Sequence, residues 1–521
     1  MHTATSAADE HDAHALQVRV RELESLLKIS EARCAKLEYK LQDLLRRIFD
    51  PKNEKLNPAQ RALFGLPEAS ASAPPVPMTA ASGTSTDACA KRKKGGGRRP
   101  PPENLPVRRE VIDLPEDQRV GLVKIREEIT TQIEYQPSMF FRRQIVRPVY
   151  ASPQRAQAPI VAALPAQVIP QAGVGPGFLT HVVIAKYVDA LPLYRQERID
   201  ARGGVWIGRQ ARCRYVEAVA HLLITIHQYL KHKILGSGYV QLDETFTKLI
   251  DPDRGGRARD AYLWGYHSPH EKAIVLEFSP SRSGAILHNF FPRDWNGEVQ
   301  TDGAAMYPGA FKHYPNLTRF ECIGHLRRYV REAVKAGEER ALPLLKDVTR
   351  LYRIEKEAAN LGLSHAKRGL YRHAKAKPVL KRLQRRFRAL EREAPLFGKL
   401  REAVTYATNR WRYLARYAKV DCGHIHIDQN AIERCFRPTK VGLRNYLFIG
   451  HPGAGWRSAV IYSVVGTCRL LGVNPEAYML WVLPKLAAAT NKTAVNLLPH
   501  DFARLHPQTD QITECESSPS S

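Results

Sequence analysis

Residues 239–250 read YVQLDETFTKLI, and this stretch decides how the rest of the chain is interpreted. It is rich in β-branched and aromatic residues and is followed by the turn-forming sequence DPDRGG, a pattern typical of a β-strand. The runs AYLWGY at 261–266 and AIVLEF at 273–278 have the same character. We therefore predict an antiparallel meander of three strands.

The segments that follow the meander alternate between helical and strand-like patterns. A helical pattern covers residues 283–290, and strand-like runs cover 297–303 and 317–323. Three strands followed by helix, strand, helix and strand is the order expected of an α/β ribonuclease-H-like core, the type found in retroviral integrases. Residues 325–420 then interrupt the pattern with a basic helical insertion. We assign the core to residues 237–324 and 421–450.

The N-terminal 50 residues carry hydrophobic side chains at alternating spacings of three and four, which predicts a coiled coil. The functional interpretation is self-association, and the alternative is one amphipathic helix packed on its own protein. The seam is formed by Leu16, Val20, Leu23, Leu27, Ser30, Cys34, Leu37, Leu41, Leu44 and Ile48.

The remaining boundaries follow from composition and periodicity. Residues 193–210 resemble a helix-turn-helix, although a helical hairpin in a scaffold fits equally well. The predicted parts are a Pro/Ala/Ser-rich basic linker (51–105), a small region (106–176), a helical DNA-binding region (177–236), a C-terminal helical region (451–505) and a disordered tail (506–521).

The overall charge of the chain points to a polyanionic partner. It has 79 Lys and Arg against 52 Asp and Glu, for a net charge of +27. The basic residues are spread along the chain rather than gathered on one amphipathic helix, which favours nucleic acid over a membrane. The sequence shows no signal peptide or transmembrane run, and its eight cysteines contain no C-x-x-C pair. We expect a cytoplasmic protein that associates with the nucleoid when bound to DNA.

Three carboxylates lie where the predicted elements can bring them together. Asp243 lies within the first strand, Asp302 at the end of the fourth, and Glu433 on a helix after the insertion. Such a set could hold two Mg²⁺ ions for an in-line displacement at phosphorus, with Mn²⁺ as a substitute. Each acid also has a purely structural interpretation, and Glu244 and Asp428 are possible replacements for the first and third positions.

Other polar residues surround the third acid. His325 could contact the scissile phosphate or a metal, although a satisfied core histidine is more common. Cys422, His424 and His426 alternate as in a strand, so we assign no zinc. Glu433 could instead only pair with an arginine at i+4 on a solvated helix. The basic residues expected to neutralise phosphates are Arg434, Arg437, Lys440 and Arg444.

Several short sequence motifs, in this order along the chain, resemble motifs of the transposases of the insertion sequence 66 family. They are LDET at 242–245, SRSG at 281–284, QTDG at 300–303, GHLRR at 324–328, DQNAIER at 428–434 and GLRNYLF at 442–448. The resemblance extends to RRPPPENLPVR at 98–108, LPLYRQE at 191–197 and NLLPHD at 496–501, so it covers most of the chain.

The resemblance implies a DDE triad of Asp243, Asp302 and Glu433 on a ribonuclease-H-like core. Arg327 and Arg328, in the word GHLRR, join the expected DNA contacts. Members of the family usually carry paired cysteines for a small zinc module, but residues 110–174 contain no cysteine. We therefore expect no zinc here.

We accordingly predict a transposase that binds the terminal inverted repeats of its element, cleaves the strands and joins them to target DNA. It would act as a homodimer or higher oligomer, with small accessory proteins as further possible partners. The alternatives are a ribonuclease-H-like nuclease without strand transfer and a non-catalytic, domesticated DNA-binding protein.

Overall fold

The computed structural model describes residues 166–507, except 171, 253–254, 394–396 and 491. It also describes residues 19–20, 23–24, 27, 140–141, 149–150 and 160–161. The predicted linker, most of the predicted coiled coil and the tail from 508 onward lie outside the described residues. The chain divides into two compact units, residues 1–53 with 143–521, and residues 54–142. The elements below belong to the first unit.

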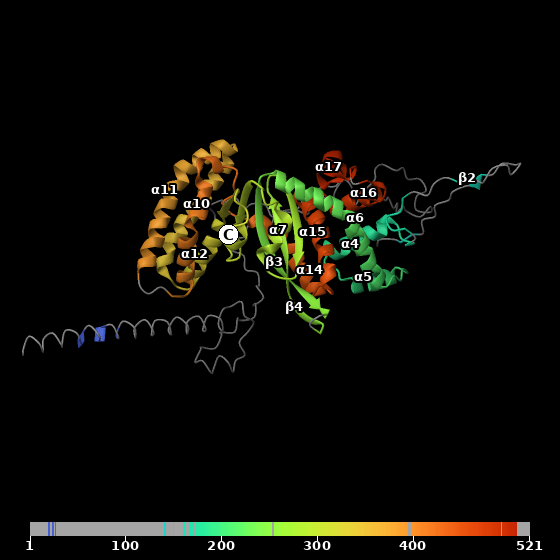
Figure 1. Cartoon of the computed structure of the whole chain (residues 1–521), viewed down its shortest axis with the longest axis horizontal. Coiled ribbons are helices and arrows are strands. Elements are labelled where there is room, and N and C mark those ends of the chain that lie inside the picture. Colours follow the sequence, from blue (N-terminus) through green and yellow to red (C-terminus); the bar gives the residue numbers. More distant parts are fainter. Residues whose placement is uncertain are drawn as a thin grey trace, which may run out of the picture. The chain divides into compact units, whose positions relative to one another are not determined.

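A five-stranded mixed sheet forms the centre of this unit (Figure 1). Its spatial order is β5-β4-β3-β6-β7; β3, β4 and β5 pair antiparallel, whereas β6 and β7 run parallel to β3. The predicted series of strands and helices is confirmed. The strands are β3 (Tyr239–Asp251), β4 (Arg257–Ser268), β5 (Ala273–Ser279), β6 (Gly297–Thr301) and β7 (Leu317–Glu321), with α7 (Leu287–Phe290) and α8 (Tyr307–Phe311) between the later ones. A separate antiparallel pair is formed by β1 (Val149–Tyr150) and β2 (Ile160–Val161).

The helices on one side of the sheet share a hydrophobic core with it. The edge strand β5 is covered by α15, whose Ser463 and Thr467 hydroxyls accept hydrogen bonds from the amides of Leu276 and Ile274. These bonds satisfy an edge that would otherwise be open to pairing. The helices are α4 (Pro176–Tyr187), α5 (Leu193–Arg202), α6 (Arg209–Gly236), α15 (Gly455–Leu470), α16 (Pro475–Ala488) and α17 (Pro499–Leu505).

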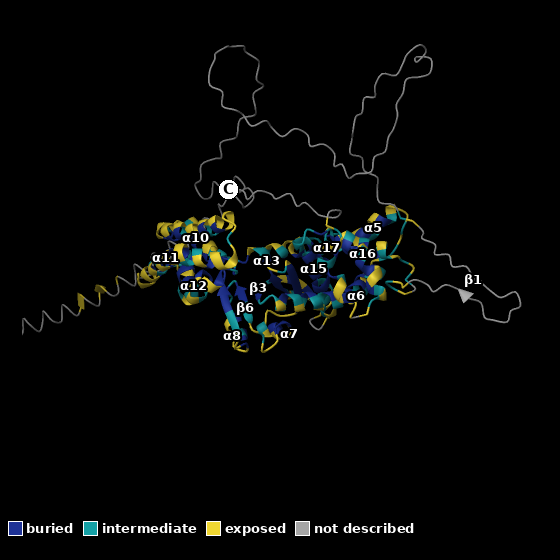
Figure 2. Cartoon of the chain, turned by 90° about the horizontal axis from the view of Figure 1, so that it is seen from above, coloured by how far each residue is buried: buried dark blue, intermediate teal, exposed yellow. Residues whose placement is uncertain are grey.

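The predicted insertion forms a helical body with its own hydrophobic core, on the other side of the sheet (Figure 1). Figure 2 shows buried residues along the inner faces of these helices and exposed ones on the outside. Arg372 is fully buried, pairs with Glu355, and donates to the carbonyls of Tyr417 and Cys422. It thereby ties the insertion to the segment that returns to the sheet. The helices are α9 (Ile323–Lys335), α10 (Leu342–Asn360), α11 (His365–Arg392) and α12 (Gly398–Leu414).

The returning segment differs from its predicted form. We expected strand-like alternation at Cys422, His424 and His426, but the chain forms a 3₁₀ turn (Val420–Cys422) followed by a loop. The short helices α13 (Asn430–Cys435) and α14 (Arg437–Tyr446) come next and contact β3. Within the part of the chain that the structure describes, no helix is long and apolar enough to cross a bilayer.

Candidate active site

The register of the sheet places Asp243 and Asp302 side by side. In the parallel pair, Gln241 of β3 lies opposite Gln300 of β6. Asp243 lies two residues after Gln241 on β3. Asp302 lies two residues after Gln300 and follows directly after the end of β6. Neighbouring strands lie about 4.8 Å apart, so the two carboxylates lie next to each other where β6 ends beside β3.

Glu433 reaches the same region because α13 approaches the sheet closely at Gly265. Gly265 on β4 lies directly opposite Asp243 on β3, and residues paired in this way face the same side. A β-carbon at Gly265 would lie only 2.6 Å from Cζ of Phe436. The missing side chain therefore makes room for the Phe436 ring. Glu433 precedes Phe436 by three residues, about one helical turn.

The electrostatics of Asp243 show that the three acids act on one another. Its pKa is raised well above the usual range, first by burial, then by the negative charges of Asp302 and Glu244, and also by Glu433. A hydrogen bond of 2.9 Å from the Glu244 amide to Oδ1 of Asp243 opposes the shift. Like charges concentrated at one place are the condition that a bound cation relieves.

Glu433 is oriented by a histidine that the sequence left undecided. Its Oε1 lies 3.7 Å from Nε2 of His325, the third residue of α9. His325 is buried, and its Nδ1 has no hydrogen-bond partner among the described residues. The expected alternative, an i+4 ion pair of Glu433 with Arg437, is not found in the described part of the chain. His325 thus contacts the third acid directly.

The two substitute acids have hydrogen-bond partners of their own, although the charge of Glu244 also acts on Asp243. Glu244 pairs with Arg282 and accepts a hydrogen bond of 2.6 Å from the hydroxyl of Tyr307. Asp428 accepts a hydrogen bond of 2.9 Å from the hydroxyl of Tyr352. It also accepts hydrogen bonds from the backbone and side-chain amides of Asn430, the first residue of α13. These bonds give Glu244 and Asp428 a structural role, whereas the side chain of Glu433 is 43% exposed and forms an ion pair, among the described residues, only with His325.

The helical insertion fixes the backbone that carries Asp302. Tyr406 of α12 donates its hydroxyl to the carbonyl of Asp302 at 2.9 Å, and Arg410 donates two bonds to the carbonyl of Gly303. Gly303 has φ of +82°, and a β-carbon there would lie 2.7 Å from Nε of Arg410. Sequence patterns do not reveal these contacts, because the partners are about a hundred residues apart.

The donor set fits a hard divalent cation. The three acids supply only oxygen ligands, which Mg²⁺ and Mn²⁺ prefer, and the pKa of Asp243 is raised first by burial and then by the neighbouring negative charges. In the side-chain positions seen here, no group of three or more His, Cys, Asp and Glu residues within the described ranges is arranged to hold a metal. Glu433 would have to turn from His325 toward the aspartates, and its exposed side chain has the freedom to do so.

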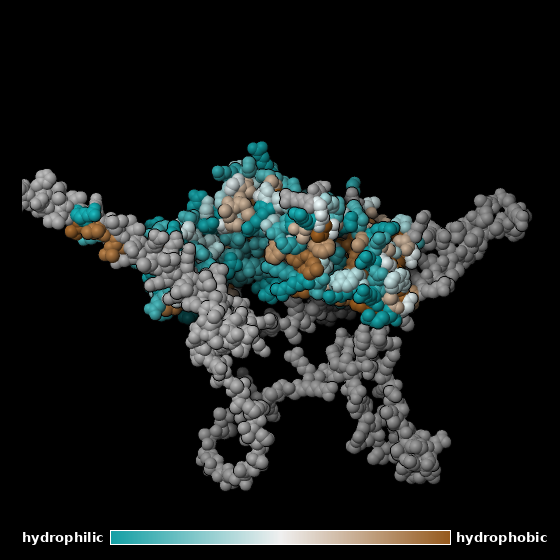
Figure 3. Space-filling view, turned by 90° about the horizontal axis from the view of Figure 1, so that it is seen from below, coloured by the Kyte–Doolittle hydropathy of each residue, from teal (hydrophilic) through white to brown (hydrophobic). Residues whose placement is uncertain are grey.

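The predicted phosphate-binding residues are all exposed. Arg437, Lys440 and Arg444 are spaced at i, i+3 and i+7 and so lie on one face of α14, beyond Arg434 on α13. Arg327 and Arg328 are exposed on α9, with the Arg327 guanidinium 5.0 Å from the centre of the Tyr352 ring. Figure 3 shows a largely hydrophilic described surface with a few hydrophobic patches. These six side chains are available to a DNA backbone.

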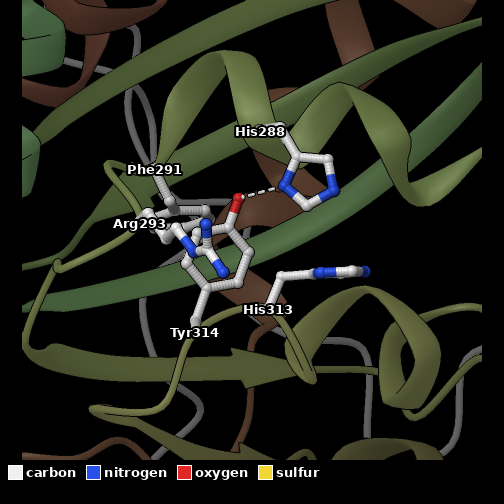
Figure 4. A pocket seen from close by; sticks show the side chains of 5 residues that line it. All are labelled: His288, Phe291, Arg293, His313 and Tyr314. Carbon is white, nitrogen blue, oxygen red and sulfur yellow. Dashed lines mark hydrogen bonds between the residues drawn. The ribbon is translucent and has the colours of Figure 1, made fainter.

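Two other polar groups lie apart from the carboxylates. His424 pairs with Glu298 of β6, so neither joins the three acids. A pocket of about 330 Å³ is lined by Arg293 and by His288, whose Nδ1 lies 2.8 Å from the hydroxyl of Tyr314 (Figure 4). It contains none of the residues singled out from the sequence.

Comparison with known proteins agrees with this geometry. The family model described as "Transposase IS66 family" matches residues 171–456, which is more than half of the chain. A second model, "Transposase C of IS166 homeodomain", matches residues 36–110, across the end of the predicted coiled coil and the predicted linker.

The relatives come from Sinorhizobium fredii. The chain is 27% identical to the uncharacterized protein y4jD over 414 residues, covering 76% of this chain and 79% of that protein. It is 28% identical to the uncharacterized protein y4qI over 401 residues, covering 73% and 72% respectively. The extent of the family-model match is decisive, and the chain belongs to the IS66 family of transposases.

Proposed function

We propose that this transposase cleaves and joins DNA strands through a DDE triad of Asp243, Asp302 and Glu433 on a ribonuclease-H-like core. The observation that carries the proposal is the convergence of three acids from β3, the end of β6 and α13: besides burial, the charges of Asp302, Glu244 and Glu433 raise the pKa of Asp243. The strand order β5-β4-β3-β6-β7, with its change from antiparallel to parallel pairing at β3, supports the choice of core.

The carboxylates would hold Mg²⁺ or Mn²⁺. When bound, the cations would activate the attacking water or 3′-hydroxyl and stabilise the leaving oxygen. In cleavage, a water oxygen forms a bond to phosphorus and the bond to the 3′-oxygen breaks. In strand transfer, the freed 3′-hydroxyl attacks a target phosphate, and a target 3′-oxygen leaves with a proton. Both steps need only carboxylates, cations and DNA.

The protein's own contribution is to fix the acids before DNA arrives. Tyr406 and Arg410 hold the backbone at Asp302, and Arg282 and Tyr307 bind the carboxylate of Glu244. His325 lies 3.7 Å from the carboxylate of Glu433 on α13. Because the aspartates sit on a strand and a strand end rather than on long loops, little ordering is required on binding.

DNA binding is supported by the family and by charge. The net charge is +27, and the residues matched by the homeodomain model belong to a class of module that reads DNA. We propose that the bound DNA is the terminal inverted repeats of the element. We also propose that the heptads of residues 1–50 pair two protomers, so that two element ends react together.

A strand-transfer assay tests the proposal. The full chain is mixed with a labelled duplex carrying its element's own end, a plasmid target and Mg²⁺. Labelled plasmid should form with the natural chain and fall at least about a hundredfold with Asp302→Asn, because removing a metal-binding charge removes most of the electrostatic stabilisation.

The outcomes separate the competing functions. Cleaved ends without joined plasmid would indicate a nuclease and contradict the strand-transfer proposal. Duplex binding without either product would support a non-catalytic DNA-binding protein. Equal product from the natural chain and Asp302→Asn would exclude Asp302 from the chemistry.

A further inference from the structure

The chain leaves helix α14 through an unusual turn. Leu447 has φ of 66° and ψ of −42°, and the amide of Phe448 donates to the carbonyl of Tyr446 at 2.8 Å. This i to i+2 bond with positive φ defines a classic γ-turn, which is rare and strained for a residue other than glycine. Strained backbone of this kind persists where the surrounding structure holds it and is concentrated at functional sites.

The turn is anchored on both sides. Before it, Tyr446 shares a hydrogen bond of 2.7 Å with the hydroxyl of Tyr462 on α15. After it, the amide of Ile449 donates to the carbonyl of Lys248 at 2.7 Å, and the carbonyl of Ile449 accepts from the amide of Ile250 at 2.9 Å. The pairing of β6 with β3 ends at Gln241, so Ile449 occupies a part of the β3 edge that β6 leaves free.

The turn presents two large apolar side chains to solvent. Leu447 is 61% exposed and Phe448 is 45% exposed, whereas the next residue, Ile449, is buried against Leu249 and Ala261. Single exposed apolar residues are ordinary, but two adjacent ones on a rigid, strained turn call for a partner.

Charge identifies the class of that partner. Leu447 and Phe448 directly follow α14, whose side chains Arg437, Lys440 and Arg444 are exposed. Proteins that bend DNA place apolar side chains, which insert between base steps, among Arg and Lys residues, and the whole chain carries a net charge of +27. The surroundings therefore match duplex DNA.

We propose that Leu447 and Phe448 form a wedge that inserts between base pairs of the bound duplex and unstacks them. Ile449 is bonded beside residue 249 of β3, six residues from Asp243, which corresponds to about 20 Å along the strand. That distance equals roughly six base-pair steps along a duplex. The wedge rests on the proposed function for the bound duplex and for the location of the reacting phosphate.

The experiment uses 2-aminopurine, an adenine analogue whose fluorescence rises when it is unstacked. It is placed at one position at a time within about ten base pairs of the cleavage site, in a duplex of the element's own end. The full chain carries Asp302→Asn, so that DNA is bound without being consumed. We expect increased fluorescence at one or two neighbouring positions.

The variants then assign the signal to the turn. Phe448→Ala should abolish the fluorescence rise and weaken duplex binding by about 5- to 150-fold, the range for loss of one aromatic stacking contact. Phe448→Trp should retain the rise. Leu447→Ala should reduce it, whereas Leu361→Ala, which removes a leucine that is 63% exposed at the end of α10, should leave it unchanged. Near-UV circular dichroism checks that each variant is folded.

The results also separate this inference from the proposed function. Tight duplex binding without any fluorescence rise, or a rise that survives Phe448→Ala, would overturn the wedge while leaving strand transfer intact. A rise accompanied by no strand transfer from the natural chain would support the wedge and contradict the proposed chemistry. A change in oligomeric state with Phe448→Ala, with fluorescence unaffected, would assign the surface to a second protomer and overturn the wedge.

Discussion

Replacing Gly265 by alanine tests whether the contact between Phe436 and Gly265 positions Glu433 near Asp243. A β-carbon at this position would lie 2.6 Å from Cζ of Phe436, about 0.8 Å short of the 3.4 Å at which ordinary contact begins. The Phe436 ring must therefore shift or rotate, and we expect this to displace Glu433, three residues earlier. Displacements of about 1 Å at a catalytic group can cost about a hundredfold in rate.

The expected result of Gly265→Ala is a large loss of strand transfer with a modest loss of stability. Overpacking of this size usually costs about 1–3 kcal/mol, which a folded chain of this length tolerates. The assay compares single-turnover strand transfer with thermal unfolding of the same preparations. Gly236→Ala is the matched control, because nothing lies within 4 Å of a β-carbon at the end of α6.

A second substitution makes the test specific. Phe436→Leu shortens the side chain that Gly265 accommodates, so the double variant should recover part of the activity that Gly265→Ala loses. Full activity of Gly265→Ala at reduced stability would refute the reasoning, because Glu433 would then not depend on this contact.

Three further predictions concern the turn, the charged face and a buried histidine. Leu447→Gly should be more stable than Leu447→Ala by about 1 kcal/mol in thermal unfolding, because only glycine adopts φ of 66° without strain; equal stability would contradict the γ-turn. Arg444→Ala should lower the slope of log affinity against log salt by about 0.9 if it neutralises one phosphate, whereas Arg504→Ala, on α17, should not. Burial, then the charges of His426 and Arg434, lower the pKa of His267 to about 3. The folded chain therefore keeps His267 neutral at pH values at which the unfolded chain protonates it. The free energy of unfolding is unaffected above about pH 6.5 and decreases as the pH falls below that value, by up to about 1.4 kcal/mol per pH unit. In chemical denaturation, the free energy of unfolding of the natural chain should decrease between about pH 7 and pH 5 more steeply than that of His267→Gln. Parallel curves for the two proteins would contradict the lowered pKa of His267.

The sequence predicted the sheet because its strands are separated by strong turn signals. The hairpin between β3 and β4, for example, turns through Gly255 and Gly256, both with positive φ, and the sequence shows the Gly-Gly pair directly. The position of Asp302 also followed from the end of a strand, and that of Asp243 from its place within one. In contrast, the alternation at Cys422, His424 and His426 was misleading, because the local pattern could not show that Arg372 binds this segment as a turn.

The rest of the site depends on contacts between distant segments. Nothing near Gly265 in the sequence indicates Phe436, which is more than 170 residues away, and nothing near Asp302 indicates Tyr406. The choice between Glu433 and Asp428 was open for the same reason. It depends on Tyr352, a residue of the insertion, which binds Asp428. Periodicity reports local structure and cannot report such pairings.

The most direct test of the triad compares these two acids. Strand transfer is measured with Glu433→Gln and with Asp428→Asn, each removing one charge at nearly constant size, and duplex binding is measured on the same samples. We predict that Glu433→Gln binds the duplex but forms no labelled plasmid, and that Asp428→Asn keeps most of the activity. Loss with Asp428→Asn and activity with Glu433→Gln would contradict the assignment of the third carboxylate.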